Sequence, residues 1–453
     1  MLRLAIFCLI LTGAGRFAWR LPAAAPAMRW LNVGLALPVV LAAHTGLVHV
    51  AGLLTTHAVA SALTLELAAI LMAVARQERG LGGEEPTGPA LPRWAVPLVA
   101  VFLAVFVLRL DFDGDLFTHW LPMARSHHLL GRHDVPALLD RYGLAHEATY
   151  PPGFPILIST LLWVAGADPQ ASLQLGDESH AAILLYRLLV AALSLSFLVA
   201  AAALASAVFR DRSSPLLPLV ALPLLIPVFL GQPMSGEVYL VPLLGASILA
   251  LWAGDAFESP SLTRVGLLLA ASGLFVKREA LVIVPLVVLP WYLAGALTKR
   301  KSLAGDLAVA GLALLPFVVW RIQLAALHLR ENFMFDDPAW GRLASPLLPR
   351  LAEQALKTVL ANGTWTALFL VLPAALVWNA RRGAWRDLLV PAGIVVYAPL
   401  MAAVYVFSRS EPLHHMDTSY ERLLMVAVLC GGLYGLRTLA EAWVVGQFDE
   451  NGP

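Results

Sequence analysis

The sequence has little charge and almost no cysteine. Of its 453 residues, 13% are charged and 59% are hydrophobic, whereas soluble domains average about 25% charged residues. Its two cysteines, Cys8 and Cys430, both lie in apolar runs, which excludes a disulfide framework and a cysteine-based metal site. A Gly-rich phosphate loop and a basic tract are also missing. These absences argue against a soluble nucleotide-dependent enzyme and against a nucleic-acid-binding protein.

Long apolar runs recur from one end of the chain to the other. About 20 apolar residues suffice to cross a bilayer as a helix. We therefore predict an all-α fold, a polytopic transmembrane helical bundle whose first segment is an uncleaved span. The Lys-poor composition, rich in Ala, Leu and Arg, indicates a bacterial inner (plasma) membrane. The apolar segments cover residues 4–15, 30–53, 57–75, 94–110, 154–166, 181–208, 215–231, 238–254, 264–276, 280–297, 304–327, 364–380, 388–407 and 422–444.

The basic residues predict the topology, because Lys and Arg in short loops favour the cytoplasmic side. Alternation from the basic loops places the charged segments 111–150, 328–362 and 408–420 outside. The short break at Lys277-Arg278-Glu279 also falls outside, against the usual bias, which suggests an anionic ligand there. The number of membrane crossings between the loops leaves two alternatives open for segment 154–166. Either this segment is re-entrant or interfacial, or the loop at Arg210 lies outside, against the bias of Lys and Arg to the cytoplasmic side.

The loop 111–150 opens with three acids, Asp111, Asp113 and Asp115, directly after an apolar run. Carboxylates at a membrane surface can act as general bases or bind a divalent metal, but they can also be a polar stop at a helix end. Apolar spacing predicts two short amphipathic surface helices in this loop. One includes residues 116–124, and the other follows Asp134 as its N-cap.

Two further motifs each allow a functional and a purely structural interpretation. Tyr150-Pro151-Pro152 is a rigid, extended entry into an apolar segment or a plain turn, because proline fixes its own φ and restricts the residue before it. Lys277 and Arg278 are suited to a phosphate group. They are equally compatible with a connecting turn that has an internal ion pair to Glu279.

The polar stretch 414–422 leads into the last apolar segment. Arg422 could reach a phosphate oxygen there. Alternatively, Asp417, Thr418 or Ser419 caps the helix while Arg422 snorkels to the interface. The histidines of the outer loop show no tight zinc-ligand spacing; they are His119, His127, His128, His133 and His146.

Taken together, these stretches resemble the GT-C class of integral-membrane glycosyltransferases, which use polyprenyl-phosphate sugar donors. The similarity is to the dolichyl-phosphate-mannose protein mannosyltransferase and aminoarabinose transferase group, and it covers about residues 94–445. The matching motifs, in order, are Asp115 with Trp120 and Arg125, then Tyr150-Pro151-Pro152, then Lys277-Arg278-Glu279-Ala280, then His415 with Thr418, Ser419 and Arg422. Two positions depart from the family pattern: Ala280 replaces a glycine and Met123 replaces a basic residue.

The resemblance implies an inverting sugar transfer on the extracytoplasmic side. Residues 1–92 would be an N-terminal three-helix membrane extension with a cytoplasmic linker, and residues 93–453 a GT-C-like catalytic domain whose catalytic loop is 111–150. The donor would be a polyprenyl-phosphate-linked sugar and the acceptor a lipid, a glycan or a protein. The resemblance assigns no metal, although a divalent metal remains open.

The resemblance also assigns roles to single residues. Asp115 would be the catalytic base, with Asp113 as its helper. The residues that hold the donor phosphate would be Lys277, Arg278 and Arg422. The residues that position the substrates would be Trp120, Tyr150, Glu279 and His415.

Two other classes compete with this hypothesis. A transporter or lipid flippase would favour charges near the middle of the membrane and an internal repeat. Glu66 lies within a span, but the sequence shows no repeat. A polysaccharide polymerase or O-antigen ligase would use the basic residues of loop 328–362. The early acidic loop and the Tyr-Pro-Pro motif argue against that class.

Overall fold

The computed structural model is helical throughout the part of the chain that it describes. Within this part it contains helices, turns and no strand, which confirms the predicted all-α class for these residues. The described residues are 2–21, 26–80, 120–132, 134–140, 149–167, 178–208, 237–293, 303–329, 341–342, 346–361, 372–373, 376–382, 385–407 and 411–450.

The chain begins with three long apolar helices. They are α1 (Leu2–Trp19), α2 (Pro26–Gly52) and α3 (Ala58–Gly80), and they match the predicted segments 4–15, 30–53 and 57–75. The three helices pack on one another, and α1 and α2 also pack on α7 (Gly153–Ala165). The guanidinium of Arg3 donates to the carbonyl oxygen of Trp163 in α7 at 3.1 Å.

The outer loop contains two short helices, α5 (Leu121–Leu130) and α6 (Val135–Asp140). Helix α6 follows Asp134, whose Oδ1 accepts a hydrogen bond from the backbone N–H of Ala137 at 3.1 Å, so the predicted N-cap is confirmed. Helix α5 shares residues 121–124 with the predicted helix 116–124 and continues six residues beyond it, whereas residues 116–119 lie outside the described part of the chain. Pro122 fits its first turn, and the helix ends at Gly131 in the left-handed conformation.

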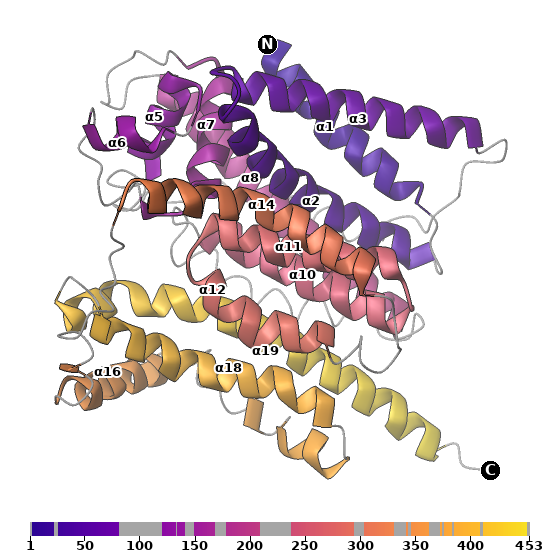
Figure 1. The fold of residues 1–453 in the computed structure, drawn as a ribbon. Coiled ribbons are helices and arrows are strands. Elements are labelled where there is room, and N and C mark those ends of the chain that lie inside the picture. The colour runs from indigo at the N-terminus through magenta and orange to yellow at the C-terminus, as the bar shows by residue number, and fades with distance from the viewer. Residues whose placement is uncertain are drawn as a thin grey trace. The chain divides into compact units, whose positions relative to one another are not determined.

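The middle of the chain contains four long helices. They are α8 (Glu178–Val208), α10 (Glu237–Ala256), α11 (Pro260–Val276) and α14 (Ala304–Ala326). Of these, α10 is almost wholly buried and α14 is mostly exposed. Figure 1 shows α10 and α11 running side by side, and they share an extensive interface. Close packing depends on small residues there, since a Cβ added to Gly266 would lie 2.6 Å from the Leu251 side chain.

Between α11 and α14 the chain forms a broken helix. Helix α12 (Ala280–Ile283) continues into a π-helical turn, Val284–Val288, and the apolar helix extends to Leu293. Insertions of this kind widen the helix by one residue and often occur near functional sites. The break before α12 is the Lys277-Arg278-Glu279 segment, as the sequence predicts.

The C-terminal part contains α16 (Leu347–Ala361), α18 (Trp385–Val404) with a 3₁₀ turn at Tyr405–Phe407, and α19 (Pro412–Glu450). The last helix begins earlier than the predicted segment 422–444, because α19 already starts at Pro412, within the stretch 408–420. The start is fixed by Glu411, whose Oε2 accepts from the His414 backbone N–H at 2.5 Å. The predicted caps Asp417, Thr418 and Ser419 therefore lie inside the helix.

The described residues include seven helices that are long and apolar enough to cross a membrane, and three shorter apolar ones. The chain is therefore a multi-pass helical membrane protein. Helix α7 has 13 residues, which at about 1.5 Å per residue covers about 20 Å, less than the bilayer core of about 30 Å. Of the two alternatives for segment 154–166, this length favours the re-entrant or interfacial one. The predicted segments 94–110 and 215–231 lie outside the described residues.

The chain divides into two compact units. Unit 1 comprises 1–277 and 308–327, and unit 2 comprises 278–307 and 328–453. The three N-terminal helices belong to unit 1 together with α7, α8, α10 and α11. The sequence predicts a boundary at residue 92, between the N-terminal extension and the catalytic domain. This residue lies outside the described residues.

Candidate functional site

Within unit 1, the first loop and the Tyr-Pro-Pro motif meet through aromatic rings. The ring centroid of Trp120 lies 5.4 Å from that of Tyr150 and 5.4 Å from that of Phe154, both in edge-to-face geometry. Trp120 is 4% exposed, and Pro151 and Pro152 are buried. The two predicted positioning residues of this unit, Trp120 and Tyr150, are thus in contact although 30 residues separate them in the sequence.

The Tyr-Pro-Pro turn also packs against the end of α11. A Cβ added to Gly153 would lie 2.6 Å from the backbone oxygen of Phe275, so only glycine allows this approach. Phe275 lies two residues before Lys277, which caps the C-terminus of α11 with its backbone N–H bonded to Gly273 O at 3.2 Å. Lys277 is 7% exposed. A cation this deeply buried in an apolar protein is a marker of function.

Within unit 2, the other half of the Lys-Arg-Glu motif meets the C-terminal motif. The hydroxyl of Tyr405 lies 2.6 Å from the Ser419 hydroxyl, and it interacts electrostatically with both Glu279 and Arg422. Arg278, Glu279 and Arg422 are half-buried. The structure therefore brings together Glu279 and Arg422, two predicted site residues that are 143 positions apart in the sequence.

Three tyrosines hold α18 and the start of α19 together around this cluster. Tyr420 donates to the Ala398 carbonyl at 2.9 Å, Tyr397 donates to the Leu423 carbonyl at 3.2 Å, and the ring of Tyr405 lies 6.2 Å from that of Tyr420. All three are at most 2% exposed. They fix the helix face that presents Ser419 and Arg422.

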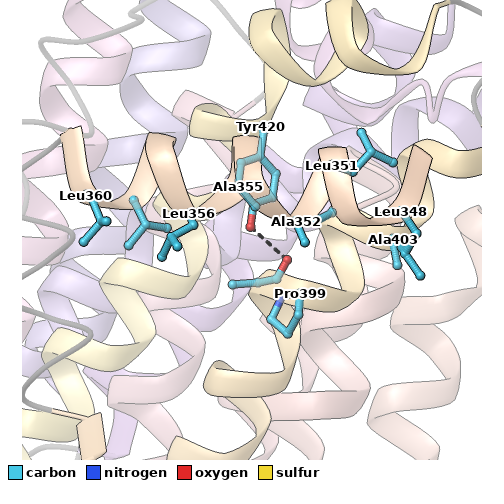
Figure 2. Close-up of a pocket in the computed structure, with 12 residues that line it drawn as sticks. Leu348, Leu351, Ala352, Ala355, Leu356, Leu360, Pro399, Ala403 and Tyr420 are labelled. Atoms are coloured by element: carbon cyan, nitrogen blue, oxygen red, sulfur yellow. Dashed lines mark hydrogen bonds between the residues drawn. The ribbon is translucent and has the colours of Figure 1, made fainter. Parts of the chain in front are cut away.

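An apolar groove of about 480 Å³ lies between α16 and α18 and reaches Tyr420. Figure 2 shows leucines of α16 along one side of it, and the bond from the Tyr420 hydroxyl to the Ala398 carbonyl. Helix α16 is amphipathic: Leu351 is buried, whereas Glu353 and Lys357 are exposed and form an ion pair at 2.7 Å. The residues labelled along the groove are Leu348, Leu351, Ala352, Ala355, Leu356, Leu360, Pro399, Ala403 and Tyr420.

The acids that the sequence predicts as catalytic, Asp113 and Asp115, lie outside the described residues, as do His119, His133 and His146. His415 lies in α19, and its side chain is outside the description. In the described ranges, no group of three or more His, Cys, Asp or Glu side chains is arranged to hold a metal ion. Metal binding by the acids of loop 111–150 therefore stays a prediction from the sequence alone.

Sequence reasoning missed Tyr405 and Phe275. Both lie at the ends of apolar segments, where an aromatic residue is ordinarily part of the core or of an interfacial belt. The signal that could have singled out Tyr405 is its polar hydroxyl near the end of an apolar run, a few residues before a motif rich in polar groups.

Comparison of the chain with known protein families, with characterised proteins and with solved structures found no match.

Proposed function

We propose that the protein is an integral-membrane glycosyltransferase that moves a sugar from a polyprenyl-phosphate donor to an extracytoplasmic acceptor. The observation that carries this proposal is the surroundings of the segment 277–279. In unit 1 the Tyr-Pro-Pro-Gly turn packs next to its lysine, at Phe275. In unit 2 its glutamate lies in the same cluster as Arg422 and Tyr405. Within each unit, one distant motif thus lies near that unit's own part of the segment.

The chemistry of the donor fits this arrangement. A polyprenyl phosphate is an anion at the end of a long apolar chain, so its binding site needs cations next to an apolar surface. Lys277 and Arg278 supply cations between α11 and α12, Arg422 supplies one inside α19, and Arg binds phosphate through two parallel N–H donors. The groove between α16 and α18 supplies the apolar surface, and it shares α18 and the start of α19 with the Tyr405 cluster.

The reaction we propose is a single displacement at the anomeric carbon. The acceptor oxygen forms a bond to that carbon, the bond from the carbon to the phosphate oxygen breaks, and polyprenyl phosphate leaves with the bonding electrons. Asp115 takes the proton from the acceptor hydroxyl, and Asp113 assists it. The cations stabilise the negative charge that grows on the leaving phosphate. Attack from the opposite face inverts the configuration.

The test is binding of a short-chain polyprenyl phosphate to the purified protein in detergent, measured by native mass spectrometry. Arg422→Gln should weaken binding at least about tenfold, because a hydrogen bond to a charged group contributes about 1.5–3 kcal/mol. The matched control is Arg382→Gln. Arg382 is exposed, and its guanidinium lies over the ring of Trp378. Lys277→Gln and Lys357→Gln form a second matched pair, one buried and one 65% exposed. Equal binding by all four variants contradicts the proposed phosphate site.

The side of the membrane can be tested separately. In a Cys8→Ala, Cys430→Ala background, Arg278→Cys should react with an impermeant maleimide added to intact cells. Lys301→Cys, in a loop predicted to be cytoplasmic, should react only in inverted vesicles. Labelling of position 278 from the cytoplasmic side alone would exclude an extracytoplasmic site.

One observation favours a transporter or flippase instead. His44 and Glu66 form a buried pair within two apolar helices, and ionisable groups at such depth often mark a substrate path. Lipid-phosphate flipping in proteoliposomes separates the two functions. If Glu66→Gln stops flipping and Asp115→Asn leaves it intact, the transporter is favoured.

A further inference from the structure

The loop helix α5 is in direct backbone contact with the hairpin formed by α2 and α3. Helix α5 ends at Gly131, with φ at 69°, and a Cβ there would lie 1.6 Å from the backbone oxygen of Thr56 in the turn of the hairpin. A Cβ on Gly52, at the end of α2, would lie 3.1 Å from the Cβ of Arg132. The end of α5 and the turn of the hairpin are therefore packed without space for even one methyl group.

A buried polar network forms a second link from the hairpin to the core of unit 1. His44 of α2 is bonded through Nδ1 to the Glu66 carboxylate of α3 at 3.0 Å, and through Nε2 to the Thr160 hydroxyl of α7 at 2.9 Å. His44 is 0% exposed and Glu66 is 9% exposed. A buried pair of this kind is expensive to desolvate and holds its elements in a unique arrangement only when its polar atoms are bonded.

The hydrogen bonds define how protons are shared in this pair. The Thr160 hydroxyl donates to the Ile156 carbonyl at 3.0 Å, so it accepts from the N–H at Nε2 of His44. The other nitrogen, Nδ1, then either carries a second proton and donates to Glu66, or accepts one from a protonated Glu66. In both cases the pair has no net charge, which suits a position among apolar helices.

Helix α5 is bonded to α7 at the residue next to this network. His127 of α5 is 2% exposed, and its Nδ1 lies 2.9 Å from the hydroxyl of Ser159, the neighbour of Thr160 on α7. It also interacts electrostatically with His44 and His49 of α2. We call His44, Glu66, His127, Ser159 and Thr160 the buried histidine cluster. The cluster ties α2, α3, α5 and α7 to one another.

We propose that the N-terminal hairpin positions the loop helix α5 through the buried histidine cluster and the contact of Thr56 with Gly131. His127 is thus a positioning residue: it holds the helix that begins next to Trp120, five residues after Asp115 in the sequence. The hairpin of α2 and α3 is then a working part of the site and not an appendage. The role in transfer rests on the proposed function, whereas the contact itself does not.

The contact is tested first, without any substrate. In the Cys8→Ala, Cys430→Ala background, Gly52→Cys with Arg132→Cys should form a disulfide on mild oxidation, because a Cβ separation near 3.1 Å needs only a small shift to reach the usual value of about 3.5–4.5 Å. A protease site inserted in the linker 81–92 lets the crosslink be read as one band instead of two on a non-reducing gel. Each single cysteine variant is the control. Two bands after oxidation of the double variant overturn the proposal.

The positioning role is tested with a matched pair of glycines. Gly131→Ala and Gly166→Ala both place a side chain at a positive φ, 69° and 76°, at the end of a helix, but a Cβ on Gly166 meets nothing within 4 Å. The backbone strain is therefore similar, and only Gly131→Ala pushes α5 from the hairpin. We expect Gly131→Ala to lower kcat for sugar transfer at least about tenfold, with little change in KM for the donor, since a small misplacement of reacting groups can cost up to about 100-fold. Equal kcat in the two variants overturns the positioning role.

A second set of variants covers the case in which Gly131→Ala does not fold. His127→Asn keeps a nitrogen near the position of Nδ1 and should retain most of kcat, whereas His127→Leu should lose it. Oxidation of the Gly52→Cys, Arg132→Cys pair should restore kcat in His127→Leu, because the disulfide replaces the lost link. A failure of both rescues overturns the proposal. If the wild-type protein transfers no sugar while the crosslink forms normally, the proposed function is wrong and the role in transfer fails with it.

Discussion

The polar clusters of the two units differ in where their charges lie. In unit 1, His44 and Glu66 are buried within long apolar helices and are bonded to each other. In unit 2, Glu279 directly before α12 and Arg422 inside α19 are half-buried, in the same cluster as the Tyr405 hydroxyl. A pair without net charge among apolar helices is suited to holding them together, whereas half-buried cations in a unit that also has an apolar groove are suited to an amphiphilic anion.

Burial and net charge therefore distinguish a cluster that holds helices together from one that binds an anion, and residue type alone does not. Both clusters combine an acid, a base and a hydroxyl. If the assignment is right, changes in unit 2 should act on donor binding and changes in the histidine cluster should act on kcat and stability. Three predictions, in order of expected effect, can break or sharpen this division.

The largest effect is expected from the acidic loop. Asp115→Asn should leave the protein folded and inserted but lower sugar transfer by about 100-fold to 10,000-fold, the usual contribution of a general base. Transfer is measured with the purified variant and a radiolabelled polyprenyl-phosphate sugar. Glu147→Gln, in the same loop, is the control and should remain active. Full activity of Asp115→Asn removes this residue as the base.

A smaller effect is expected in the groove of unit 2. Ala355 lines it and is 9% exposed, so Ala355→Phe should fill part of the 480 Å³. Affinity for a long-chain polyprenyl phosphate should fall about tenfold, because each methylene that stays in water forfeits about 0.8 kcal/mol. Affinity for a short-chain analogue should hardly change. Ala326→Phe, on the exposed face of α14, is the matched control. An equal loss for both chain lengths would mean that the substitution damages the fold.

The smallest effect concerns pH and the histidine cluster. Burial, with smaller contributions from His49, His128 and His44, lowers the pKa of His127 from 6.5 to about 3. Between these values the unfolded chain binds a proton that the folded protein does not, so stability falls as the pH falls below 6.5. The loss is about 1.4 kcal/mol for each pH unit. Thermal unfolding in detergent between pH 7.5 and 5.5 measures it.

The control for the pH experiment is a pair of substitutions. His127→Asn removes the titrating group and should flatten this dependence. His57→Asn, at an exposed position of the hairpin turn, should leave the dependence as it is in the wild type. Identical slopes for wild type and His127→Asn contradict the buried, neutral state of His127.

Much of the fold follows from local sequence. Long apolar runs predict the spanning helices, Asp134 predicts the start of α6, and the charges at 277–279 predict the break before α12. The early start of α19 also had a local signal, since an acid followed by proline at the first helical position favours a helix start. The polar residues after Pro412 nevertheless favour a loop when the sequence is considered alone.

The contacts that define the clusters could not be predicted in this way. The bonds of His44 to Thr160 and of His127 to Ser159 join residues that are 116 and 32 positions apart. The approach of Gly131 to Thr56 depends on the packing of two helices, and a glycine after a helix is equally expected as a simple cap. From the sequence, Glu66 is only a charge within a span, because its partner His44 is on another helix.

The most direct test of the account is a structure of the purified protein with a bound polyprenyl-phosphate analogue. We predict that the phosphate lies against Arg422 and the segment 277–279, with the prenyl chain in the groove between α16 and α18. A phosphate bound at another site, or a protein that binds no lipid phosphate at all, would contradict the proposed glycosyltransferase site.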